Sequence, residues 1–255
     1  MKRALILLIA VFAILAFTAC GNSIGKEETP MSEEAAPEYI VIGDEQICIS
    51  LTELSLRGKG LSDDDIVPLR YMTNLSELDL RDNQISDLLP LSGLTNLWRL
   101  DLRDNQISDL SPLSNLMNLW RVNLRGNQIS DLSPLSDLTD LWRLNLRDNQ
   151  INDLSPLAGL TDLWRLNLRD NQVSDLLPLS HLANLAELNL RNNQISNLVP
   201  LSSLTSLTAL DLRGNQISDL LPLADLANLT ELDLRDNDAI TDWSPVAHVP
   251  DILGY

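Results

Sequence analysis

The chain has 255 residues, of which 44% are hydrophobic but only 4% aromatic, and this apolar content is too high for a disordered chain. The net charge of −18 argues against a general nucleic-acid binder, because phosphate groups would be repelled. Two cysteines and two histidines exclude a zinc finger, an iron–sulfur cluster and a disulfide-stapled mini-domain.

The N-terminal segment, residues 1–19, has the features of a secretion signal. Two basic residues at positions 2 and 3 precede an uncharged run, which is shorter than the roughly 20 residues that a spanning helix needs. The motif Phe17-Thr18-Ala19-Cys20-Gly21 resembles the lipobox of bacterial lipoproteins, in which leucine usually stands at the position of Phe17. The resemblance implies cleavage after residue 19 and lipidation of Cys20, which would anchor the protein on the extracytoplasmic side of a bacterial membrane. The alternative is an ordinary signal peptide with an incidental cysteine.

A linker and a cap are expected before the repeats begin. Residues 20–38 hold Cys20 and a small, acidic, proline-containing stretch, which predicts a disordered tether. Residues 39–50 are expected to form an N-terminal cap. Cys48 lies in an apolar run within this cap, so we expect it to be a buried small hydrophobe. It would be the only thiol left in the mature chain once Cys20 is lipidated.

A period of 22 residues organises the rest of the chain. One row begins LWRLNLRDNQINDLSPLAGLTD at Leu141, and the pattern L-x-x-L-x-L-x-x-N-x-I continues as S-D-L-x-P-L-x-x-L. This pattern resembles the leucine-rich repeat, in its internalin-like class, over residues 51–250, with about nine repeats. Residues 251–255 would be the tail of a C-terminal cap. The resemblance implies an α/β, β-rich solenoid with short parallel strands on the concave face and turns and 3₁₀ segments on the convex face.

The residues within one row support the same fold independently. Leu100 and Leu102 alternate with charged residues, which predicts a short strand with one buried face. Apolar residues then recur every third position from Ile107 to Leu116, as a 3₁₀-like arc requires. Pro112 discourages a long helix there. A single row buries too little to fold alone, so stability must belong to the stacked array.

One asparagine per row follows the strand, and its amide can satisfy backbone groups in the turn. We expect these side chains to stack as a structural ladder, made of Asn83, Asn105, Asn127, Asn149, Asn171, Asn193, Asn215 and Asn237.

Strand alternation also predicts which side chains face outward on the concave side. One arginine column recurs in every row, at Arg57, Arg81, Arg103, Arg125, Arg147, Arg169, Arg191, Arg213 and Arg235. A second column is confined to the central rows, where each arginine follows a tryptophan, and glutamate or alanine replaces it outside. Positive charge is therefore expected to be least compensated over residues 119–169. The predicted partner-binding residues are Trp98, Arg99, Trp120, Arg121, Arg125, Trp142, Arg143, Arg147, Trp164, Arg165 and Arg169.

Tryptophan and arginine commonly dominate binding hot spots, so the first hypothesis is a membrane-anchored, extracytoplasmic, monomeric module that binds a protein through its concave Arg/Trp face. Binding of a glycan or an anionic polymer of the cell envelope is one alternative. A passive scaffold is another, in which the arginines form a solvated ion-pair lattice and the tryptophans are copies left by duplication or only stack and cover the edge of the sheet. We expect no enzyme, cofactor or metal site, because the catalytic and phosphate-binding motifs are missing and the two histidines are isolated.

Overall fold

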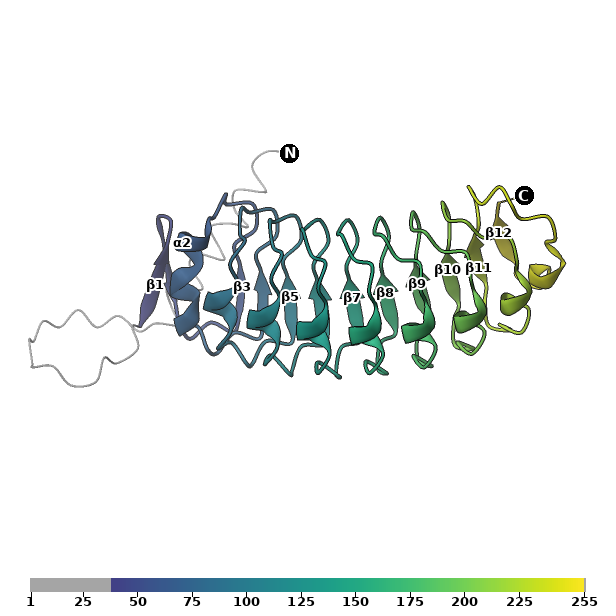
Figure 1. The fold of residues 1–255 in the computed structure, drawn as a ribbon. Helices are drawn as coiled ribbons and strands as arrows, with labels where there is room; N and C mark the ends of the chain where they lie inside the picture. Colours follow the sequence, from purple (N-terminus) through teal and green to yellow (C-terminus); the bar gives the residue numbers. More distant parts are fainter. Residues whose placement is uncertain (1–37, 255) are drawn as a thin grey trace, which may run out of the picture.

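The computed structural model describes residues 38–254 as a single curved solenoid (Figure 1). The predicted signal, Cys20 and nearly all of the tether lie outside the described residues and stay predictions. Ten short strands form one parallel sheet in chain order. They are β3 (Glu53–Ser55), β4 (Glu77–Asp79), β5 (Arg99–Asp101), β6 (Arg121–Asn123), β7 (Arg143–Asn145), β8 (Arg165–Asn167), β9 (Glu187–Asn189), β10 (Ala209–Asp211), β11 (Glu231–Asp233) and β12 (Asp251–Leu253).

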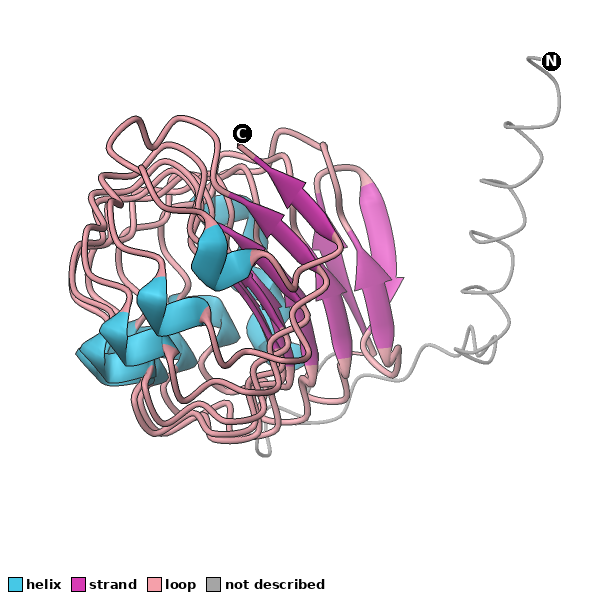
Figure 2. Ribbon diagram, turned by 90° about the vertical axis from the view of Figure 1, so that its right-hand side faces the viewer, coloured by secondary structure: helices cyan, strands magenta, loops and turns pink. Residues whose placement is uncertain are grey.

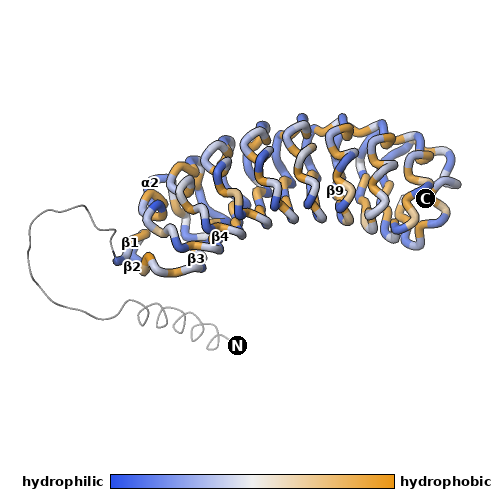
Figure 3. The backbone as a smooth tube through the Cα atoms, turned by 90° about the horizontal axis from the view of Figure 1, so that it is seen from below, coloured by the Kyte–Doolittle hydropathy of each residue, from blue (hydrophilic) through white to orange (hydrophobic). Residues whose placement is uncertain are grey.

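Short 3₁₀ segments run along the opposite side of each coil (Figure 2). The first coil differs, because the α-helix α2 (Asp63–Ile66) leads into its 3₁₀ segment. The 3₁₀ segments are η1 (Val67–Tyr71), η2 (Leu89–Leu91), η3 (Ser111–Leu113), η4 (Ser133–Leu135), η5 (Ser155–Leu157), η6 (Leu177–Leu179), η7 (Val199–Leu201), η8 (Leu221–Leu223) and η9 (Ser244–Val246). The strands line the inner side of the arc, so the predicted leucine-rich repeat solenoid is confirmed (Figure 3).

The register of the sheet follows directly from the repeat. From β4 to β11 each strand residue pairs in parallel with the residue 22 positions further on, as Leu144 does with Leu166. The offset is 24 between β3 and β4 and 20 between β11 and β12, at the two ends of the array. Leu100 and Leu102 are 1% and 0% exposed, whereas their neighbours in the strand lie at the surface, so the expected alternation is present. The inward leucines of successive coils form one continuous core from Ile40 to Val249. The burial of each coil therefore depends on its neighbours.

The ladder asparagines bridge successive coils. The amide nitrogen of Asn105 donates to the carbonyl of Leu102 in its own coil and to that of Leu80 in the preceding one, each at 3.0 Å. Its Oδ1 accepts the backbone N–H of Ile85 at 3.1 Å. Corresponding bonds recur from Asn83 to Asn237, so the turn after each strand is satisfied by a side chain instead of water.

Additional elements cover both ends of the core. An antiparallel hairpin, β1 (Tyr39–Ile42) and β2 (Glu45–Cys48), buries Ile40, Ile42 and Ile47 against the first coil. At the other end, β12 adds a tenth strand beyond residue 250, where we expected the array to end. Cys48 is buried as expected, but it is disulfide-bonded in this structure and is not a free thiol. Its bonding partner lies outside the described residues.

Within residues 38–254 no helix is long and apolar enough to cross a membrane. The same residues contain no group of three or more histidine, cysteine or acidic side chains arranged to hold a metal ion.

Candidate functional site

The predicted tryptophans and the second arginine column lie next to each other on four adjacent coils. Leu97 and Leu100 point into the core, which leaves Trp98 and Arg99 between them at the surface. The same arrangement repeats on β6, β7 and β8, since these strands pair in register. Four indole rings therefore run along the edge where the chain enters the sheet, beside four guanidinium groups on the strands.

The four indoles form two stacked pairs. The ring centroids of Trp98 and Trp120 are 5.2 Å apart with planes inclined by 6°, and those of Trp142 and Trp164 are 4.9 Å apart with planes inclined by 15°. Between the pairs, Trp120 and Trp142 are tilted by 57°. The rings are half-buried because they cover one another.

Arg143 is held against the second pair of rings. Its guanidinium carbon lies 4.7 Å from the ring centroid of Trp142 and 5.2 Å from that of Trp164. Cation–π contact at this range favours the charged side chain and limits its freedom. Arg143 is therefore preorganised on the face.

The first and last members of the second arginine column each form an ion pair. Arg99 contacts Glu77 at 3.0 Å, and Arg165 contacts Glu187 at 2.8 Å. Among the residues that the structure describes, no carboxylate lies within 4.0 Å of the guanidinium nitrogens of the two inner members, Arg121 and Arg143. The replacement of arginine by glutamate on either side of the central rows was the sequence signal for this arrangement.

Arg121 lies in a strongly positive environment. Burial lowers its pKa below the ordinary arginine value, and the charges of Arg99 and Arg143 lower the pKa further, while Asp101 opposes them. Arginine stays protonated at any physiological pH. The field around Arg121 therefore favours the approach of an anionic group.

The other predicted arginines are compensated, contrary to the expectation for residues 119–169. Arg125 contacts Asp148 at 3.3 Å, and Arg147 lies 3.1 Å from Asp148 and 3.5 Å from Asp170. Arg169 pairs with Asp170 at 2.9 Å. The carboxylate comes from the turn of the following coil for Arg125, from the arginine's own turn for Arg169, and from both for Arg147. Most of this column therefore forms the ion-pair lattice that was one of the alternatives.

These turn carboxylates share a backbone conformation that the sequence analysis did not identify. The residue before each ladder asparagine has a positive φ, between 54° and 60° at the aspartates and Asn192, and 67° and 68° at Gly126 and Gly214. Glycine, asparagine and aspartate tolerate this left-handed conformation best. The signal was present in the sequence, since this position is always one of these three residues from Asp82 to Asp236.

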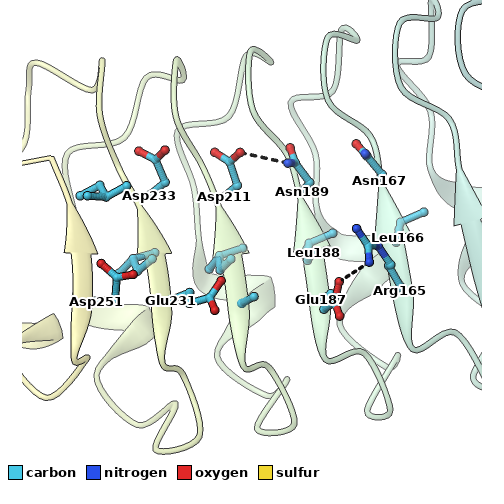
Figure 4. Close-up of a pocket in the computed structure, with 14 residues that line it drawn as sticks. Arg165, Leu166, Asn167, Glu187, Leu188, Asn189, Asp211, Glu231, Asp233 and Asp251 are labelled. Atoms are coloured by element: carbon cyan, nitrogen blue, oxygen red, sulfur yellow. Dashed lines mark hydrogen bonds and ion pairs between the residues drawn. The ribbon is translucent and has the colours of Figure 1, made fainter. Parts of the chain in front are cut away.

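Beyond Arg165 the face becomes acidic. The surface there is hollowed over β8 to β12, and we call this region the C-terminal hollow; its lining includes Glu187, Asn189, Ala209, Asp211, Glu231 and Asp251 (Figure 4). Burial raises the pKa of Asp211; the backbone N–H of Arg213 opposes the rise and the charge of Asp233 adds to it. Asn189 donates its amide to Asp211 at 2.9 Å. The predicted site residues did not include this region.

Comparison with known proteins gives a consistent assignment. A family model described as Leucine Rich repeats (2 copies) matches residues 73–115, 95–137, 183–224 and 205–248. The solved structure of an internalin (inlF) from Listeria monocytogenes is 33% identical, with a TM-score of 0.69, over 83% of this chain and 70% of that chain. Internalin C2 of the same organism is also 33% identical, with a TM-score of 0.66, over 83% of this chain and 86% of that chain.

A more distant similarity concerns the fold alone. The plant peptide hormone receptor RGFR1, solved in complex with RGF2, is 22% identical with a TM-score of 0.61, over 73% of this chain and 36% of that chain. The search of curated proteins finds no match.

Proposed function

The chain belongs to the internalin-like family of bacterial leucine-rich repeat proteins, and on this premise we propose that it is a cell-envelope module that recognises a protein partner. Its concave sheet is a long open surface, a shape that suits a macromolecular partner better than an enclosed small molecule. The resemblance of residues 17–21 to a lipobox supports attachment to the extracytoplasmic side of the membrane through Cys20.

One observation carries the proposal. Arg121 and Arg143 have no carboxylate partner among residues 38–254, and they lie between two ion pairs and beside the stacked tryptophans. A carboxylate of a partner would meet no competing anion there. Arginine offers forked donors and tryptophan a large, stiff apolar area, which is why both are frequent in hot spots.

The stacking geometry favours a protein over a glycan. Sugar rings bind tryptophan by lying flat on an exposed indole face. Here the indoles lie against each other, and Arg143 covers part of the second pair. The half-buried indoles still offer apolar area to apolar and aromatic side chains of a protein surface, which contact aromatic rings edge-on or offset.

Two matched pairs of substitutions test the proposal. Arg121→Ala with Arg143→Ala removes the uncompensated arginines, whereas Arg125→Ala with Arg147→Ala removes ion-paired arginines on the same coils. We expect affinity capture from envelope and host-cell extracts to retain a protein with the wild-type chain and the second variant, and to lose it with the first. Equal loss with both variants, or none with either, would contradict the proposal.

Salt dependence separates the glycan and polymer alternative. A polyanion held by several arginines should dissociate steeply as the ionic strength rises. A protein held by Arg121 and Arg143 together with the apolar surface of the tryptophans should weaken less, because fewer charges take part in the contact. A captured ligand that is a polysaccharide would refute recognition of a protein.

A further inference from the structure

On the concave face of the described coils, the strand position of the second arginine column is acidic on β3 and β4 (Glu53 and Glu77), basic from β5 to β8, and acidic again on β9, β11 and β12. The uncompensated Arg121 and Arg143 lie on β6 and β7, in the middle of the sheet. The ion pair between Arg165 and Glu187 follows on β8 and β9 (Figure 4). Past this pair the outward-facing residues of β10 to β12 are acidic, except for Ala209 and the exposed Leu253.

Among the described residues, most acids of this half also lack a basic partner, although Asp233 pairs with Arg235. Glu231 and Asp251 are exposed, and no arginine or lysine of residues 38–254 lies within ion-pair distance of either. Asp211 is partly buried beside them and accepts hydrogen bonds from Asn189 and from the backbone of Arg213, but it has no basic partner in the same range.

A missing side chain opens space between these acids. Ala209 occupies the column position that Glu187 and Glu231 occupy on the adjoining strands. With only a methyl group there, the surface sinks into the C-terminal hollow. A long basic side chain could extend over Ala209 and come near Asp211 and Glu231 together.

From this charge order we infer that the partner carries an acidic region facing Arg121 and Arg143 and a basic region facing the C-terminal hollow. The inference rests on the proposed function and adds the partner's polarity to it. Docking in the reverse direction would place the basic region over β3 and β4. Glu77 and Asp79 are already paired there with Arg99 and Arg81, so only Glu53 would be left to attract it, and complementarity would be weaker. The two regions are separated by the four strand spacings from β7 to β11, about 19 Å, which an extended chain covers in about six residues.

Three fluorescent peptides with blocked ends serve as probes of the full chain. The bipolar peptide has a glutamate block, a neutral spacer of about six residues and a lysine block. The acidic peptide replaces the lysines by glutamines, and the basic peptide replaces the glutamates by glutamines. At low salt, fluorescence anisotropy should show the bipolar peptide binding about tenfold more tightly than either single-charge peptide, since several weak exposed pairs add together.

A charge-reversal variant provides the sharper result. Glu231→Lys with Asp251→Lys replaces two uncompensated acids of the C-terminal hollow by basic groups, so the acidic peptide should become the tightest ligand. Asp225→Lys with Asp238→Lys alters the net charge equally, at exposed positions outside the strands, and should keep the wild-type preference. Circular dichroism would verify that both variants fold.

The outcomes separate this inference from the proposed function. If the acidic peptide binds through Arg121 and Arg143 but the lysine block adds nothing, the polarity is wrong and the binding face stands. If the two double variants change preference equally, net charge is responsible and the inference is overturned. If no probe binds at low salt, both are contradicted.

Discussion

Replacing Asn127 by alanine should destabilise the solenoid more than any change at an exposed residue of the same turn. The Asn127 amide nitrogen donates to the carbonyls of Leu102 at 3.1 Å and Leu124 at 3.0 Å, and its Oδ1 accepts the backbone N–H of Ile107 at 3.0 Å. Ile107 is fully buried, so water cannot replace that acceptor.

The size of the expected loss in stability depends on which backbone groups keep a hydrogen-bond partner after the substitution. The two carbonyls still accept hydrogen bonds from Asn105 and Asn149, so each loses one bond of two, at about 0.5–1.5 kcal/mol. The N–H of Ile107 is left without an acceptor, at about 1–3 kcal/mol. The expected loss in the free energy of unfolding is therefore about 2–6 kcal/mol, a large part of the stability of a typical domain.

Urea unfolding followed by far-UV circular dichroism measures this loss, provided that the slope with denaturant stays constant. Gln128→Ala is the matched control, because Gln128 is exposed and its backbone bond to Ile107 does not involve the side chain. It should change the stability by less than about 0.5 kcal/mol. A loss below about 1 kcal/mol for Asn127→Ala, or one equal to that of the control, would refute the role given to the ladder.

Three further predictions concern backbone strain, titration and lipidation. Gly214→Ala should lower the stability by about 1–2 kcal/mol because φ is +68° there, and Gly214→Asn by less than half of that; thermal melts with equal losses would show that strain is not the cause. Burial raises the pKa of Asp211 in the folded state, so Asp211→Asn should stabilise the protein at pH 7, and the gain should disappear as the pH falls and the carboxyl becomes protonated in both states. Urea midpoints at pH 7 and at acidic pH check this, and a gain that grows at low pH would contradict it. If Cys20 is lipidated, protein from bacterial membranes should lack residues 1–19 by mass spectrometry. The Cys20 sulfur would then be occupied by lipid, so Cys48 should react with maleimide after denaturation without reductant. A requirement for reductant would show that Cys48 is instead oxidised, as in this structure.

The sequence by itself determined the fold, because the physics of one coil is local and repeats every 22 residues. In one coil, the inward Leu100 and Leu102 alternate with outward charged residues, and Pro112 limits the segment that follows to a short 3₁₀ turn. An asparagine equivalent to Asn105 recurs in each coil where backbone carbonyls need a hydrogen-bond donor. The tryptophans and arginines that reach the concave side follow from the same alternation. None of these inferences requires knowing how far apart two coils lie.

Only the tertiary structure decided which charges remain uncompensated. Arg125 and Asp148 are 23 positions apart, and the rise of the solenoid, not the sequence pattern, brings them to 3.3 Å. The four tryptophans have identical spacing in sequence, yet Trp120 and Trp142 are tilted where the flanking pairs stack. Side-chain conformations and contacts between coils depend on the distances between side chains in three dimensions. The repeat pattern of the sequence does not specify these distances.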